Sequence, residues 1–129
     1  MAQRDPVDKN LLRMEGRRFV ARCEMVVSSI ERADTLREIS RLATSLTLPY
    51  AITEDYAARD ALRLVQTRAE DRARELIHDQ LQNFLRAEDN QRDKQRRAML
   101  DAWTSLSGPL GHLHAWAQSK LLAAQQQSR

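Results

Sequence analysis

The stretch from Thr53 to Ser107 contains neither glycine nor proline, and this absence limits the possible folds more than any other feature of the sequence. Glycine and proline are the residues that most readily end a helix or form a turn. A helix-start pattern opens the stretch, with Thr53 as N-cap and acidic residues in the first turn, and Gly108-Pro109 ends it. Its apolar residues form one helical stripe: Ala58, Leu62, Val65, Ala69, Ala73, Leu76, Leu81 and Phe84. The stretch therefore predicts a long central helix that other helices cover.

The composition also favours an all-α fold. Three glycines and three prolines in 129 residues leave little material for the turns of a sheet. The length is that of one domain with a sizeable core. We predict a single helical domain over residues 1–129, built as an antiparallel bundle of four to five helices with one long central helix. The expected helices span about 6–32, 35–46, 54–88, 90–106 and 109–125.

Local signals place the first two helices. Asp5-Pro6 combines a favourable N-cap with proline at the first helical position. Thr35 and Glu38 match a capping box for the second helix. Gly16 lies on the apolar stripe of the first helix, where glycine is about 1 kcal/mol less favourable than alanine. A close helix crossing at Gly16 would explain its presence.

The polar segment 86–97 is compatible with two arrangements, because Ala87 is its only apolar residue. In the first, one helix continues and exposes about three turns on every side. In the second, the chain turns near Asp89-Asn90 and a new helix starts with Asn90 as N-cap. The absence of strong breakers supports the first arrangement, and compactness supports the second, which we favour.

Charge, cysteine content and hydropathy indicate the compartment. No apolar run is long enough to span a bilayer or to form a signal peptide. Cys23 is the only cysteine, which excludes an intrachain disulfide and fits a reducing compartment. We therefore expect a cytoplasmic protein that does not associate with membranes.

The residues needed for catalysis or metal binding do not occur in suitable patterns. His112 and His114 are two positions apart and point in different directions on a helix. Two histidines of one helix that bind the same metal ion need a spacing of three or four. Cys23 lies in an apolar stripe, where a thiol behaves as a small hydrophobic group. The chain has no Gly-x-Ser-x-Gly elbow and no glycine-rich phosphate loop. The sequence thus predicts no enzyme, no metal site and no cofactor.

Basic residues are concentrated in two places, on the first helix and in the polar segment 86–97. Arginine is suited to bidentate phosphate contacts, so either cluster is a candidate nucleic-acid contact. Acidic neighbours such as Asp89 and Asp93 dilute the second cluster, and no recognition-helix or aromatic-platform motif accompanies either one. The candidate residues are Arg13, Arg17, Arg18, Arg22, Arg92, Lys94, Arg96 and Arg97. A nucleic-acid-binding accessory protein is therefore the alternative hypothesis.

Protein binding is the first hypothesis. Met14 and Met25 lie with Ala21 on a thin second stripe of the first helix, away from its core face, and methionine suits an adaptable contact surface. Trp103 and Trp116 are the two largest side chains, typical either of interfaces or of a core short of aromatic residues. We predict a non-enzymatic interaction subunit or adaptor that has a protein partner and self-associates.

Overall fold

The computed structural model describes residues 6–127, and these residues contain helices and no strand. The all-α prediction with one long central helix is confirmed for this part of the chain. The helices are α1 (Pro6–Arg32), α2 (Leu36–Thr44), α3 (Tyr56–Arg86), α4 (Asp89–Trp103) and α5 (His112–Gln127), with 3₁₀ turns η1 (Tyr50–Ile52) and η2 (Gly108–Leu110).

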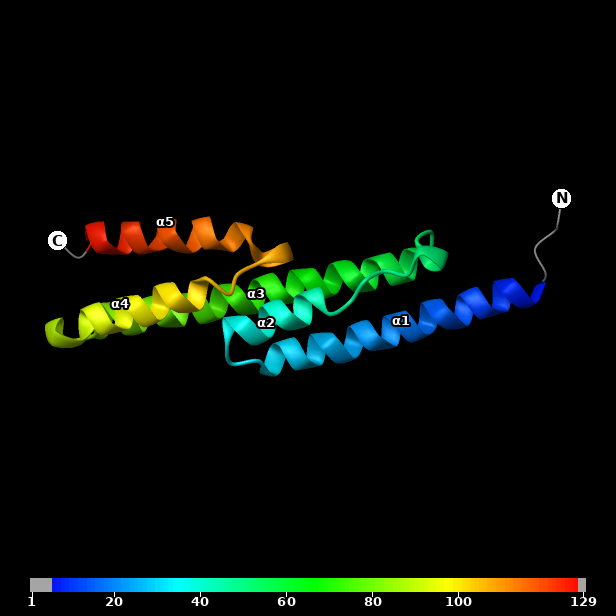
Figure 1. The fold of residues 1–129 in the computed structure, drawn as a ribbon, viewed down its shortest axis with the longest axis horizontal. Helices are drawn as coiled ribbons and strands as arrows, with labels where there is room; N and C mark the ends of the chain where they lie inside the picture. Colours follow the sequence, from blue (N-terminus) through cyan, green and yellow to red (C-terminus); the bar gives the residue numbers. More distant parts are fainter. Residues whose placement is uncertain (1–5, 128–129) are drawn as a thin grey trace.

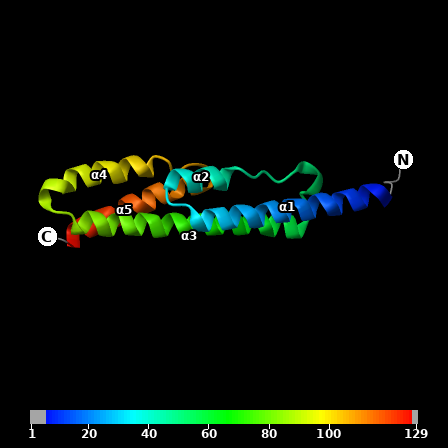
Figure 2. The same cartoon turned by 90° about the horizontal axis from the view of Figure 1, so that it is seen from below.

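The helices form two layers around α3 (Figures 1 and 2). One layer holds α1, α3 and α5, with α3 in the middle; α2 and α4 lie end to end over one face of that layer. Successive helices run antiparallel, as expected. The two helices with the most extensive contact, α1 and α3, run parallel, because α2 and the loop with η1 run back along α1 before α3 begins (Figure 1). The start of α3 lies beside Gly16 of α1.

The start of α3 differs from the prediction. Asp55, not Thr53, is the N-cap: its Oδ1 accepts a hydrogen bond from the Ala58 backbone N–H at 3.0 Å. The Thr53 hydroxyl instead donates to the Tyr50 carbonyl oxygen at 3.1 Å and so closes the preceding turn η1. Both residues are good caps, and packing of η1 selects the later one.

The cap of α2 is confirmed at Thr35, whose Oγ1 accepts from the Glu38 backbone N–H at 3.2 Å. The reciprocal half of the capping box is absent, because the Glu38 carboxylate pairs with Arg41. This hydrogen bond lowers the pKa of Glu38 below its usual value. The predicted cap at Asp5 lies outside the described residues.

The polar segment turns, as we favoured. α3 ends at Arg86 and α4 begins at Asp89, with Glu88 rather than Asn90 at the N-cap position. Ala87 and Glu88 adopt extended backbone angles (φ −67°, ψ 144° and φ −67°, ψ 154°) that any residue can take. Two extended residues suffice to reverse the chain, so the turn needs no glycine or proline.

Three further helix bounds fall short of the prediction, while α5 extends to Gln127, past the predicted end at 125. α2 ends at Thr44 and α4 at Trp103, and α5 begins at His112 rather than at Pro109. Pro109 lies in the 3₁₀ turn η2 instead. Gly108 has φ +54°, in the left-handed region, so glycine is required at this bend.

Buried side chains from every helix meet in one core around α3. Alanine at Ala58, Ala69 and Ala73 keeps the core face of α3 narrow, which lets neighbouring helices approach closely. At Gly16 the close neighbour is the N-cap side chain of α3 rather than the body of a crossing helix: a Cβ there would overlap the carboxylate of Asp55. Within residues 6–127, no helix combines the length and apolarity needed to cross a bilayer.

Candidate interaction surface

The two tryptophans have different environments. Trp103 is fully buried, and its indole Nε1 donates to the Gln80 side-chain oxygen at 2.9 Å, so it belongs to the core and not to a partner surface. Trp116 is half-buried on α5, and its ring has the Arg74 guanidinium and the Lys120 ammonium group on it at 5.7 and 5.8 Å from the centroid. Only Trp116 remains available to a partner.

The candidate methionines lie on the outer face of α1. Met14 is 48% exposed and Met25 is 71% exposed, and Leu11 on the same face is 55% exposed. The two methionines lie roughly half a turn from the buried Cys23, because successive residues are 100° apart around the helix. We define the outer stripe of α1 as Leu11, Met14, Arg18, Ala21 and Met25, which are all exposed.

A second apolar feature is a groove of about 360 Å³ lined only by α1 and α3. Val20, Val27 and Leu64 supply much of its wall, and Cys23 lies between the two helices. Burial raises the pKa of the Cys23 thiol, with Arg22 opposing and Glu24 adding to this shift. This groove was not predicted from the sequence, although Ala57, Ala61 and Leu64 recur at helical spacing outside the main stripe.

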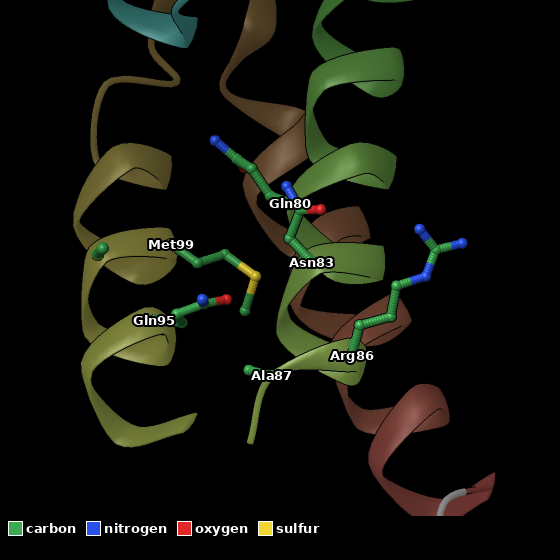
Figure 3. A pocket seen from close by; sticks show the side chains of 7 residues that line it. Gln80, Asn83, Arg86, Ala87, Gln95 and Met99 are labelled. Carbon is green, nitrogen blue, oxygen red and sulfur yellow. The ribbon is translucent and has the colours of Figure 1, made fainter. Parts of the chain in front are cut away.

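A cleft of about 470 Å³ separates the end of α3 from the start of α4 (Figure 3). Its polar side chains are Gln80, Asn83 and Gln95, and Met99 reaches between the two helices (Figure 3). The Arg86 side chain points away from α4 (Figure 3). Amides and a thioether neither accept a proton at neutral pH nor act as nucleophiles, so these groups do not form a catalytic constellation.

The histidines lie in different surroundings. His112 Nε2 lies 3.4 Å from a carboxylate oxygen of Glu70. His78 lines the groove between α3 and α5, together with Asp71, Glu75 and other residues. In the described part of the chain, no group of three histidine, cysteine, aspartate or glutamate side chains has the arrangement of a metal site.

The basic candidates are all exposed, but they do not form one surface. The cluster on α1 comprises Arg13, Arg17, Arg18 and Arg22, and the cluster on α4 comprises Arg92, Lys94, Arg96 and Arg97. These segments lie toward opposite ends of the molecule (Figure 1). Arg92 is also 3.6 Å from Asp89, and Arg22 lies 5.8 Å from the centre of the Phe19 ring. The fold therefore does not join the two clusters into one continuous track for a phosphate backbone.

The fold and its surfaces define a helical bundle with apolar side chains exposed along α1. Comparisons with models of protein families, with curated proteins and with solved structures find no match for this chain. A proposal for the function therefore depends on the exposed faces of α1 and α3.

Proposed function

We propose that this protein is a non-enzymatic interaction subunit that works by burying exposed helix faces against protein, including a second copy of itself. The proposal depends mainly on the outer stripe of α1, where the large apolar side chains of Leu11, Met14 and Met25 are exposed to water along one face. Burial of apolar surface is favourable by about 25 cal/mol per Å². An aligned set of such residues is typical of a contact surface.

The neighbouring groove between α1 and α3 supports the same function. Leu64 is nearly half exposed at its edge, and the groove is bordered by Glu24 and Asp60. An apolar centre with a charged rim is the usual arrangement of a protein interface. The same two helices therefore present apolar surface on two sides of α1.

Light scattering coupled to size-exclusion chromatography tests the proposal at low and at high salt, with and without nucleic acid. We expect a mass above the 14.9 kDa of one chain that persists at high salt, because apolar burial is not screened by ions. Met14→Glu combined with Met25→Glu should return the protein to one chain. Leu122→Glu on α5 is the matched control, since Leu122 is also exposed but lies off α1, and it should keep the larger mass.

Two results would contradict the proposal. A mass of one chain at every protein concentration would remove self-association. A complex that forms only with nucleic acid, weakens steeply with salt, and is lost when Arg92, Arg96 and Arg97 are neutralised would establish nucleic-acid binding instead.

A further inference from the structure

The spacing of the outer stripe suits pairing with another helix. Its residues follow one another at intervals of three and four, which is the spacing of the a and d positions of a coiled coil. The stripe faces away from the core side of α1, so a second helix can lie along it without meeting α3 of the same copy. Ala21, near the middle, allows a close approach.

The charges that flank the stripe have a definite pattern. Arg17 and Glu24 lie seven residues apart on one flank, and Glu15 and Arg22 lie seven apart on the other. Each flank therefore carries one positive and one negative group. No ion pair within residues 6–127 involves Arg17, Glu24 or Glu15, so these charges are free to meet a partner.

The pattern discriminates between the two orientations of a symmetric pair. In a parallel pair, Arg18 would face Arg18 of the second copy, and Arg17 would face Arg22, so like charges would meet. In an antiparallel pair centred between positions 19 and 20, Arg17 faces Glu24 of the second copy and Glu15 faces Arg22. By symmetry each of these opposite-charge contacts occurs twice.

We propose that two copies of this protein pair antiparallel through the outer stripe of α1. This inference rests on the proposed function and names its site and geometry. Met14 then packs on Met25 of the second copy, and the aliphatic stem of Arg18 lies over Ala21 while its guanidinium reaches the rim. The flanking charges select the antiparallel orientation, and the apolar residues supply the affinity.

Disulfide cross-linking measures the geometry directly. We expect a mixture of the Met14→Cys and Met25→Cys proteins to form a disulfide between the two variants, because these positions face each other. Neither variant alone should form one, since two copies of position 14 would be about 16 Å apart along the axis at 1.5 Å per residue. Leu122→Cys serves as a control for random collision, and native Cys23 is kept because it is 1% exposed.

Charge exchange tests the orientation independently. Arg17→Glu should weaken the dimer about tenfold, because it places two like-charge pairs at the interface. Adding Glu24→Arg should restore the wild-type affinity, since the exchanged pair again has opposite charges. Arg97→Glu makes the same charge change on α4 and should leave the affinity unchanged.

The outcomes separate this inference from the proposed function. If the wild type forms a dimer, but the Met14→Cys variant cross-links with itself or Glu24→Arg fails to rescue Arg17→Glu, the antiparallel pairing is overturned and the interaction function stands. A wild-type protein that remains one chain in light scattering at all concentrations overturns both.

Discussion

The guanidinium of Arg72 donates two hydrogen bonds to the backbone carbonyl oxygen of Ala33, from Nη2 at 2.9 Å and from Nε at 3.1 Å. Ala33 directly follows α1, so this carbonyl lies at the negative end of the helix dipole. Arg72 also donates from Nη1 to Glu75 at 2.9 Å. The end of α1 is thereby tied to the middle of α3, which fixes how far the two parallel helices are displaced along each other.

Replacement of this arginine should destabilise the fold. We expect Arg72→Ala to lower the free energy of unfolding by about 1–3 kcal/mol, because hydrogen bonds from a partly buried charged group are lost. Urea unfolding followed by circular dichroism measures the change. Arg63→Ala is the control. Arg63 is exposed, and its Nη1 makes only a long ion pair of 4.0 Å with Asp60 Oδ1, so we expect the free energy of unfolding to change by no more than about 0.5 kcal/mol. Equal effects of the two variants would show that the Ala33 contact contributes nothing.

Local signals in the sequence were sufficient to predict most of the helices. The Thr35 cap, the proline at the start of α1 and the apolar periodicity all correspond to the structure, since each depends on neighbouring residues alone. The cap of α3 could not be assigned in this way. Thr53 and Asp55 have similar intrinsic preference, and the choice depends on where η1 packs, which is a tertiary effect.

Relations between distant segments were not predictable. The parallel contact of α1 with α3, the Arg72 contact and the groove all depend on which helix faces are brought together. The different environments of the two tryptophans could not be predicted either. Both lie on apolar stripes near the same turn in the sequence, yet α3 covers Trp103 and leaves Trp116 partly exposed.

The contact between Gly16 and Asp55 should make two substitutions interdependent. Gly16→Ala would gain about 1 kcal/mol in helix propensity. When Asp55 is present, the new Cβ meets its carboxylate, which caps α3. The gain should then be offset, because losing this cap costs about 1 kcal/mol of stability. In an Asp55→Ala background the carboxylate is absent, and Gly16→Ala should then be stabilising. A double-mutant cycle by urea unfolding measures this coupling, and additive effects would refute it.

Cys23 should react slowly with thiol reagents in the folded protein. The side chain is buried and its pKa is raised by desolvation, so access and thiolate formation are both limited. We expect labelling by a chromogenic disulfide at pH 8 to be slow and to accelerate in urea. The Leu122→Cys variant should show one additional, rapidly reacting thiol. Rapid labelling of wild type under native conditions would contradict the buried position.

The same pKa shift has a consequence for stability at high pH. Because the folded pKa of Cys23 is above its unfolded value, the fold favours the neutral thiol. The contribution of this group is fully present below the unfolded pKa and is lost as pH rises through the folded value. We therefore expect Cys23→Ala to flatten the decline in stability above about pH 9. Parallel pH profiles for the two proteins would show that this thiol has no role in the decline.

The environments of Trp103 and Trp116 predict two classes of fluorescence quenching. Iodide should quench Trp116, because its ring is partly exposed, and should leave the fully buried Trp103 unaffected. Trp116→Phe should remove the quenchable fraction and leave a blue-shifted emission from Trp103 in its apolar surroundings. Equal accessibility of both residues to iodide would be inconsistent with the packing of α4 against α3. Iodide quenching that persists in Trp116→Phe would assign the exposed ring to Trp103.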